Sequence, residues 1–455
     1  MDIVIIGGGP AGLTAAWECQ RLGIATSLTL IEKEARLGGL AKSYRYADGS
    51  AFDIGPKRFH TEDPSVLSFL RKVSEGNPLM EIDRSSKVLF LNRYFTWPLA
   101  LRDVFRLPAT TASCAVKDLL FLSAYNNTDP VSFEQYILSK YGRTLYELFF
   151  RPYTEKFLRT TIAQIHRDWA TTGIDRSIIH KEAQSNSLAQ LVRKILLPPR
   201  TDMNFLYPQD GPFGSFWDLC ERELRKQGAQ VRTETTVEHV RKNGERFILC
   251  LSDGSELQAD TVLWSGKITD LLRAIGAPLR NLPFIDTIFV DLVVPSEDVR
   301  REAITQWLYV SSALTPISRI SFPRLFRPEN IPGGEGLCVE VTVGENERVD
   351  TASLSRSVLE SLQTLGILRR CRPQVIEVHR NTSTYPLYHR SYQEEVKAAT
   401  ESIESFSGSI IPFGRSGSFW YNNCDHSIKQ ALSIVTALAG NERSRFNPHQ
   451  VFGGG

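Results

Sequence analysis

The amino-terminal residues combine three glycines in a spacing that suits binding of a dinucleotide. The segment Gly7-Gly8-Gly9-Pro10-Ala11-Gly12 contains Gly-x-Gly-x-x-Gly directly after the apolar run Asp2–Ile6. In such a turn Gly7 permits a tight bend, Gly9 lets the backbone approach a pyrophosphate, and Gly12 lets a helix pack closely on a strand. The amino-terminal end of the following helix would face the anion, because its first N–H groups have no partner within the helix.

An acid follows these glycines at a distance that suits a nucleoside. Glu32 lies twenty residues beyond Gly12, where a carboxylate can accept hydrogen bonds from both hydroxyls of an adenosine ribose. The same carboxylate disfavours a 2′-phosphate, and therefore NADP. The alternative, a glycine-rich turn with a surface glutamate, is disfavoured because strand, glycines, helix and acid occur in register. These residues alone leave open whether the dinucleotide is FAD or NAD.

The flanking sequence predicts the elements that position these groups. Asp2–Ile6 is rich in β-branched residues, Ala11–Leu22 has a helical composition, and Ser27–Ile31 alternates, so the three predict one βαβ unit. The later predicted elements are, in chain order, a helix at 133–141, a hairpin turn at 253–254, a buried strand at 259–264, strands at 287–292 and 337–341, and a helix at 427–438 that packs back on the first domain.

A length of 455 residues exceeds what one compact core usually buries, so we expect two or more lobes with a cleft between them. The composition changes from mixed to helical and then to β-rich along the chain. The predicted division is a discontinuous dinucleotide-binding domain at 1–97, 206–282 and 383–440, a helical insertion at 98–205, a substrate-side β-rich lobe at 283–382 and a flexible tail at 441–455.

Arg36 and Gly38-Gly39 extend the pattern after Glu32 to Glu-x-x-x-Arg-x-Gly-Gly. This resembles the second fingerprint of the amine oxidase and protoporphyrinogen oxidase superfamily of FAD enzymes, whose arginine and glycines lie along the cofactor. The resemblance implies FAD, and an α/β fold with a Rossmann-type FAD-binding domain of the GR2-like kind and an inserted helical and mixed β substrate lobe. The expected cofactor-binding residues are Gly7, Gly9, Pro10, Ala11, Gly12, Glu32, Lys33, Arg36, Gly38, Gly39, Leu40, Gly55, Pro56, Lys57, Arg58, Val237, Gly414, Arg415, Asn423, Asp425, His426 and Ser427.

Further segments resemble the UDP-galactopyranose mutase branch of that superfamily. They are Ala51–Phe59 (the flavin loop), Phe150–Lys156 with Asp168-Trp169-Ala170 (the substrate-lobe helix and its Trp), Trp307–Tyr309 with Pro316–Arg319 (whose Tyr and Arg meet the nucleotide-sugar diphosphate) and Gly414–Ser427 (the closing motif). In the closing motif the resemblance implies that Arg415 and Asp425 touch the cofactor and that Tyr421 faces the substrate.

Two departures from the mutase pattern bear on the chemistry. The histidine of the flavin loop is replaced by Lys57. A cation there would stabilise negative charge on a reduced flavin, while a solvated loop lysine is the alternative. The first diphosphate-binding arginine of the mutases is replaced by Gly173, with Arg176 three residues later as a possible substitute.

The expected catalytic residues are Lys57, Tyr309, Arg319, Tyr385 and Tyr421. Arg319 and Tyr309 suit a phosphate clamp, because arginine offers a planar fork of donors and tyrosine a hydroxyl. An interlobe salt bridge and a core aromatic are the alternative for this pair, and simple packing is the alternative for Tyr385, which precedes a proline. For His60 and His426 the positions favour structural hydrogen bonds over acid–base roles.

The composition limits the other partners. The chain holds 53 basic and 51 acidic residues, a formal charge of +2, so no large field favours nucleic acid. Its seven cysteines stand singly, without a Cys-x-x-Cys pair or a histidine cluster, and we expect reduced thiols and no metal. No stretch is apolar and long enough to span a bilayer, and no leader precedes the first strand, so we expect no transmembrane segment and a cytoplasmic location.

Together these features predict an FAD-dependent enzyme acting on a small molecule. The leading interpretation is an oxidoreductase, in which the flavin takes a hydride and oxygen or another acceptor reoxidises it; Lys57 and Gly173 favour it. The alternative is a mutase, in which reduced flavin attacks the anomeric carbon of a nucleotide sugar; Arg319 and Tyr309 favour it. A flavin-binding protein without catalysis is disfavoured by the intact cofactor motifs.

Overall fold

The computed structural model describes residues 1–97, 106–121, 129, 131–174, 205–370, 373 and 375–440. A five-stranded parallel sheet lies in one half of the molecule, in the order β19 (Ile410–Pro412), β13 (Thr261–Trp264), β1 (Asp2–Ile6), β2 (Ser27–Ile31), β9 (Gln230–Arg232). Its central strands bury Ile5, Leu30 and Leu263 completely, as both faces of the sheet are covered. The predicted strands 2–6 and 27–31 are confirmed.

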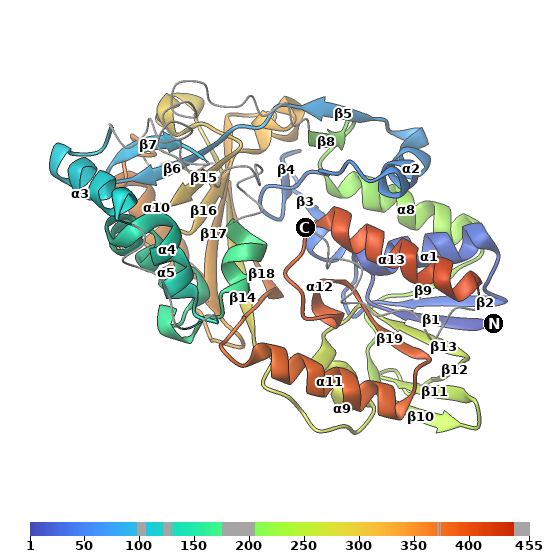
Figure 1. Ribbon diagram of the computed structural model, residues 1–455. Helices are drawn as coiled ribbons and strands as arrows, with labels where there is room; N and C mark the ends of the chain where they lie inside the picture. The colour runs from blue at the N-terminus through green and yellow to red at the C-terminus, as the bar shows by residue number, and fades with distance from the viewer. Residues whose placement is uncertain are drawn as a thin grey trace.

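Helices cover this sheet and begin and end where the sequence signals it. In α1 (Pro10–Leu22), Pro10 stands at the first turn, and Gly23 ends the helix in the left-handed conformation. α1 packs against α13 (Cys424–Ala439) and α8 (Gly214–Lys226), with α2 (Pro64–Val73) beside them (Figure 1). α13 contains the predicted helix at 427–438, which packs on the first domain as expected.

A smaller antiparallel sheet of β10 (Val237–Asn243), β11 (Arg246–Leu251) and β12 (Glu256–Ala259) extends this half, and the predicted turn at 253–254 joins its last two strands. The pairs β3 (Ser43–Arg45) with β4 (Ala51–Asp53), and β5 (Leu79–Ile82) with β8 (Phe205–Pro208), lie above the parallel sheet in Figure 1. Helices α9 (Ile268–Ala274) and α11 (Tyr392–Phe406) pack against each other below it.

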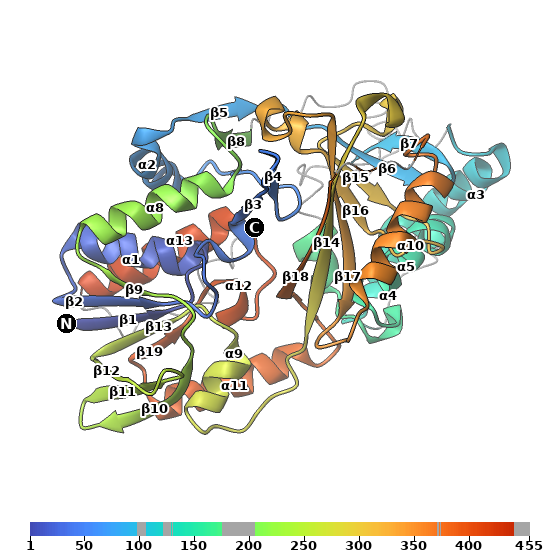
Figure 2. The ribbon, with the colours of Figure 1, turned by 180° about the vertical axis from the view of Figure 1, so that it is seen from behind.

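The other half is built on a seven-stranded sheet. Its order is β18 (Val375–Pro386), β14 (Phe284–Val294), β17 (Glu335–Gly344), β16 (Arg319–Ser321), β15 (Trp307–Val310), β6 (Ser86–Phe90), β7 (Arg93–Thr96). Figure 2 shows this sheet between the parallel-sheet half and a layer of α3 (Ala109–Leu120), α4 (Phe133–Leu145), α5 (Arg151–Leu158) and α10 (Thr351–Thr364). The predicted helix at 133–141 and the predicted strands of this second sheet are confirmed.

Alternation along the strands of this sheet decides which side chains face the dinucleotide half. In β14, Ile288, Val290 and Leu292 join the core under α10, while Phe289 and Val293 pack with Phe52 and Ile54 of the other half. In β17, Val339 and Val341 face α10. Glu340, between them, therefore points the other way, toward the dinucleotide half.

Strands β6 and β7 pair into this second sheet although the sequence assigned residues 1–97 to the first domain. The division into domains stays a prediction. The expected tail at 441–455, and residues 98–105, 122–128, 130 and 175–204 of the expected helical insertion, lie outside the described residues.

Candidate active site

The glycine turn joins β1 to α1 at the carboxyl end of the parallel sheet. Gly7 has a φ of +97°, and a Cβ there would lie 2.5 Å from Ser265 Oγ. A Cβ on Gly12 would lie 1.8 Å from the Gly7 carbonyl oxygen, so packing within the chain requires both glycines. Gly9 differs, because its Cβ would meet only Gly39 Cα, at 3.8 Å. Packing within the chain therefore does not require a glycine at this position. A ligand that comes close to the backbone would require one.

Glu32 is buried at the end of β2 and is fixed by two backbone amides. Its Oε2 accepts from the Gly8 N–H (2.7 Å) and its Oε1 from the Glu34 N–H (3.0 Å). Each carboxylate oxygen keeps a further lone pair, so the group can still accept two ribose hydroxyls. The Glu32 carbonyl accepts from the Thr235 N–H (3.0 Å), which brings the start of β10, and with it the half-buried Val237, to the same region.

The second fingerprint lies against the first. The Gly38 N–H donates to the Gly8 carbonyl (2.8 Å), and Gly38 and Gly39 both have positive φ, as only glycine adopts readily. Leu40 follows in the short turn Gly39–Ala41. Arg36 is exposed, donates to the Ser43 carbonyl (3.1 Å) and lies 3.5 Å from Asp218.

The closing motif reaches the same edge of the sheet from β19. Gly414 has a φ of +72°, and its Cβ would lie 2.8 Å from that of Ala11, next to Pro10. The guanidinium of Arg415 donates to the carbonyls of Thr384 (2.9 Å) and Asn422. At the start of α13, Asn423 is exposed, Asp425 and His426 are half-buried, and Ser427 is buried.

These segments follow β1, β2, β13 and β19, on both sides of the point where the strand order reverses between β1 and β13. Open parallel sheets bind ligands at such a point, outside the carboxyl ends of the strands. The open space at Gly9, the remaining lone pairs of Glu32 and the amino-terminal end of α1 together fit a dinucleotide.

Arg319 lies on the sheet opposite this edge and is paired with a buried acid. Its Nε and Nη2 lie 2.7 and 2.6 Å from Oε2 of Glu340, which is 1% exposed. The Tyr385 hydroxyl donates to Glu340 Oε1 (2.7 Å) and lies 3.3 Å from Arg319 Nη2. Burial by itself would lower the pKa of Arg319, but Glu340 raises it well above its usual value, so the guanidinium stays charged. The pair fixes one side of the guanidinium and leaves Nη1 for a ligand.

Aromatic rings surround this pair. Tyr421 stacks on Trp169, with ring centroids 4.8 Å apart, and meets Tyr385 edge-on at 5.4 Å. Arg415 lies 5.2 Å from the Tyr421 ring. Tyr309, on β15, packs against Tyr153 at 6.2 Å and lies 6.0 Å from the Arg319 guanidinium. Tyr153 and Trp169 belong to the substrate-lobe segments of the mutase resemblance, although neither was named as an expected cofactor-binding or catalytic residue.

The flavin loop of the mutase resemblance meets Arg319 directly. A Cβ on Gly55 would lie 3.4 Å from Arg319 Nη2 and 3.8 Å from Glu340 Oε2. Lys57 follows the half-buried Pro56. It makes no hydrogen bond or ion pair with another described residue. Burial, and then Arg415 and Arg319, lower the pKa of Lys57 to about 8.

Lys57 is within electrostatic range of Arg319 and Arg415, and Arg58 is within range of Arg319 and Arg84. These five cations form what we call the cation cluster: Lys57, Arg58, Arg84, Arg319 and Arg415. Three carboxylates of the described residues lie among them: Glu340, which is bonded to Arg319, Asp425, which lies 3.4 Å from His426 Nδ1, and the buried Asp53, which is within electrostatic range of Lys57. Positive charge therefore exceeds negative charge in this part of the site, which favours an anionic ligand.

The structure thus brings together Lys57, Tyr309, Arg319, Tyr385, Tyr421 and Arg415. It places Lys33 apart from them: Lys33 is exposed and donates to Thr382 Oγ1 (3.3 Å). Gly173 lies in the helical turn Ala170–Ile174, and Arg176 lies outside the described residues. Glu340 and Arg84 were missed. The signal for Glu340 was a single acid within the apolar strand at 337–341, since a buried carboxylate needs a cation.

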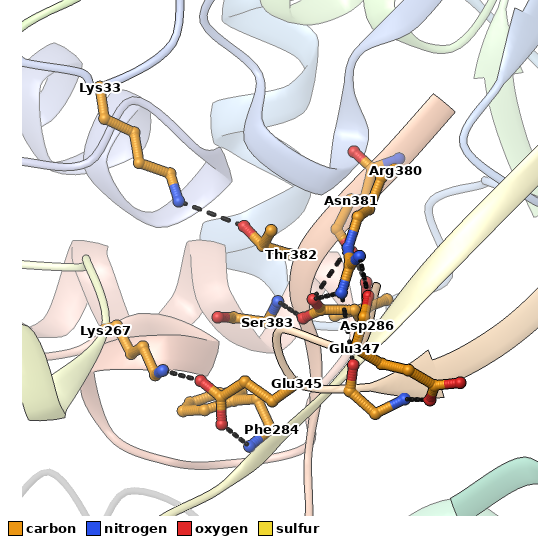
Figure 3. A network of polar contacts seen from close by, with 12 residues as sticks. Lys33, Lys267, Phe284, Asp286, Glu345, Glu347, Arg380, Asn381, Thr382 and Ser383 are labelled. Carbon is orange, nitrogen blue, oxygen red and sulfur yellow. Dashed lines mark hydrogen bonds and ion pairs between the residues drawn. The ribbon is translucent and has the colours of Figure 1, made fainter. Parts of the chain in front are cut away.

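A bulge in β18 sets the position of Tyr385. Ile285 pairs with Tyr385 and Thr287 with Asn381, so Asp286 alone faces the intervening residues. Figure 3 shows Asp286, which is 1% exposed, accepting from the Arg380 guanidinium (2.8 Å) and from the Ser383 N–H (2.8 Å). The bulge also presents the Thr384 carbonyl to Arg415.

Figure 3 also shows two contacts that join the halves of the molecule beside this bulge. Lys33, after β2, reaches Thr382, and Lys267, after β13, pairs with Glu345 beyond β17. Glu345 in turn accepts from the Phe284 N–H (3.0 Å) at the start of β14.

The comparisons with known proteins agree with this geometry. The NAD(P)-binding Rossmann-like domain family matches residues 5–73. A probable UDP-galactopyranose mutase of Klebsiella pneumoniae is 26% identical over 159 residues, which are 34% of this chain and 40% of that protein. The chain therefore matches less than half the length of this curated relative.

Solved structures show the same relationship at the level of the fold. The structure of reduced UDP-galactopyranose mutase has a TM-score of 0.84 at 20% identity, and covers 99% of this chain and 98% of that chain. Wild-type putrescine oxidase bound to putrescine has a TM-score of 0.63 at 15% identity, with 96% and 99% covered.

The fold and the glycine turn define a Rossmann-type dinucleotide-binding protein. Within that class, the fold is the one seen in the solved structures of the reduced mutase and of putrescine oxidase. The resemblance inferred from the sequence and the α/β fold class are confirmed.

None of the helices in the described part of the chain is long and apolar enough to cross a membrane. No group of three or more histidine, cysteine or acidic side chains is arranged there to hold a metal ion.

Proposed function

We propose that this protein is an FAD-dependent enzyme whose substrate carries a diphosphate, with a nucleotide sugar as the leading class. The main support for this proposal is the cation cluster, which includes Lys57 and Arg58 of the loop Gly55–Arg58 and in which positive charge exceeds negative charge. An uncharged substrate would leave the excess positive charge of the cluster unbalanced, whereas a diphosphate offers several oxyanions to guanidinium forks.

The residues that would hold FAD are those around the glycine turn. Gly9 would admit the pyrophosphate, Glu32 would bind the adenosine ribose, and Gly38 and Gly39 would line the path toward Gly55. When bound, the flavin supplies either hydride acceptance or, in reduced form, a nucleophile for an anomeric carbon.

The chain's own residues have separable roles in this proposal. Arg319, held by Glu340, would present Nη1 to a phosphate oxygen without losing side-chain freedom on binding. Tyr385 and Tyr421 would shape the site, because their rings pack edge-on beside the same guanidinium. Lys57, with a pKa lowered to about 8, can exchange a proton near neutral pH and would offset negative charge on the ring of a reduced cofactor.

A second candidate, an oxidoreductase of the amine oxidase-like type, is favoured by two residues. Lys57 stands where the mutases have a histidine, and Gly173 where they have an arginine. Hydride removal needs no diphosphate leaving group, so an oxidoreductase would tolerate the absence of an arginine that binds a diphosphate.

One experiment separates the two. Dithionite-reduced holoprotein is incubated without oxygen with a panel of nucleotide sugars, and oxygen uptake by the oxidised protein is followed in parallel. Ring isomers formed only by the reduced protein support the mutase-like function. Substrate-dependent oxygen uptake without isomers supports the oxidoreductase and refutes the leading proposal.

A further inference from the structure

Arg58 occupies an unusual position within the cation cluster. Its guanidinium carbon lies 4.2 Å from the ring centroid of Phe205 and 4.3 Å from that of Trp307. These two buried rings are 6.2 Å apart and tilted by 44°, so Arg58 lies in the wedge between them. Both rings hold the planar side chain in one orientation.

The contacts of Arg58 do not balance its charge. It makes no hydrogen bond or ion pair with another described residue, and its Nε is buried without an acceptor. Burial, followed by the neighbouring Arg84, lowers the pKa of Arg58 to about 10, while burial also lowers that of Arg84. The Arg84 guanidinium approaches the same Trp307 ring, at 5.8 Å from its centroid. A desolvated guanidinium without a hydrogen-bond acceptor, such as that of Arg58, is unfavourable unless an anion binds it.

The position of Arg58 relates it to the substrate side of the site. Trp307 and Tyr309 are two residues apart on β15, so their side chains share one face of that strand. Arg58 is within electrostatic range of Tyr309, Arg319 and Asp425. Lys57, its neighbour in the chain, is also within electrostatic range of Arg319, but its further cationic neighbour is Arg415, whereas that of Arg58 is Arg84.

We propose that Arg58, wedged between Phe205 and Trp307, forms with Arg84 a second oxyanion subsite that takes a phosphate or carboxylate group of the substrate, apart from the subsite at Arg319. This inference rests on the proposed function, since it needs a substrate bound beside Tyr309. It adds that recognition requires negative charge at two places.

The test uses the FAD-loaded full chain and three probes, inorganic pyrophosphate, malonate and uncharged uridine, titrated by calorimetry. The variants are Arg58→Gln and Arg58→Lys, and Arg222→Gln is the matched control because Arg222 is exposed on α8. Arg58→Gln should weaken oxyanion binding by about 10- to 100-fold, the range for hydrogen bonds to charged groups. Arg58→Lys should show a smaller loss, while the control and the uridine titrations should not change.

The outcomes separate this inference from the proposed function. Stronger binding of pyrophosphate than of malonate assigns the subsite to phosphate, and the reverse order assigns it to carboxylate. If the parent protein binds neither, the proposed function and the inference both fail. If the parent binds an oxyanion and Arg319→Lys weakens it, but both Arg58 variants bind as the parent does, only the inference fails. If Arg58→Gln does not retain FAD, Arg58→Lys decides: unchanged affinity overturns the subsite.

Discussion

Gly9 and Gly12 allow the role of each glycine in the turn to be tested separately, because the structure assigns them different neighbours. A Cβ on Gly9 meets one atom at 3.8 Å, and the φ of −77° at Gly9 suits any residue. A Cβ on Gly12 overlaps the Gly7 carbonyl at 1.8 Å. Substitution at Gly9 should therefore impair ligand binding, and substitution at Gly12 should impair folding.

The expected magnitudes follow from these distances. Gly9→Ala should change the free energy of unfolding of the FAD-free protein by no more than about 1 kcal/mol, mainly because Gly9 precedes the first turn of α1 as its cap. Gly12→Ala must separate α1 from β1, and should lower the free energy of unfolding by about 3 kcal/mol or more. Gly9→Val should retain the fold but lose FAD, because its branched side chain would occupy the space of the pyrophosphate.

The assay combines urea unfolding of FAD-free protein with the FAD released per chain on heat denaturation. The parent should be yellow and release FAD rather than FMN or NAD. Gly9→Val with the FAD content of the parent would show that the pyrophosphate site is misplaced. An unfolding free energy of Gly12→Ala equal to that of the parent would refute the packing argument.

Three further substitutions test the site. Arg319→Ala should weaken UDP binding, measured by flavin absorbance, by about 1.5–3 kcal/mol without changing the FAD content. It should also lower the free energy of unfolding, measured in urea, because it leaves Glu340 buried without its cation. Adding Glu340→Gln to this variant should recover the stability but not the UDP affinity. Unchanged UDP affinity in Arg319→Ala would exclude the clamp. Because the pKa of Lys57 is lowered to about 8, Lys57 is charged below that pH and neutral above it, so the affinity for anions should fall as the pH rises through 8. Lys57→Met should remove this fall in affinity. A fall that persists in Lys57→Met would assign it to another group. Asp286→Asn should lower the free energy of unfolding by about 1–3 kcal/mol, because it weakens the contacts with the half-exposed Arg380 and with Ser383 that hold the bulge. A urea midpoint equal to that of the parent would show that the bulge does not depend on this carboxylate.

Local signals in the sequence sufficed for the dinucleotide half. The strand at 2–6, the helix from Pro10, the strand at 27–31 and the acid after it all lie within one continuous segment, and each follows from periodicity or turn chemistry. The helix at 427–438 was equally visible because its apolar face repeats at the helical period. The roles of the expected cofactor-binding and catalytic residues stay predictions.

Pairings between distant segments could not be read in the same way. Strands β6 and β7 pair with each other, and they have no local feature that assigns them to the seven-stranded sheet. Only β6 contacts the rest of that sheet, through β15, which lies more than two hundred residues away in the chain. Nothing near Arg58 in the sequence indicates that Phe205 and Trp307 hold its guanidinium.

The sequence by itself determined the βαβ unit, its glycine turn and the acid at Glu32, because these depend on spacing within one segment and on the conformations that glycine permits. Only the tertiary structure decided that Arg319 pairs with Glu340, and that Arg58 lies between Phe205 and Trp307. The physical reason is that charge balance and burial depend on which elements meet across the two sheets, and those contacts join residues far apart in the chain.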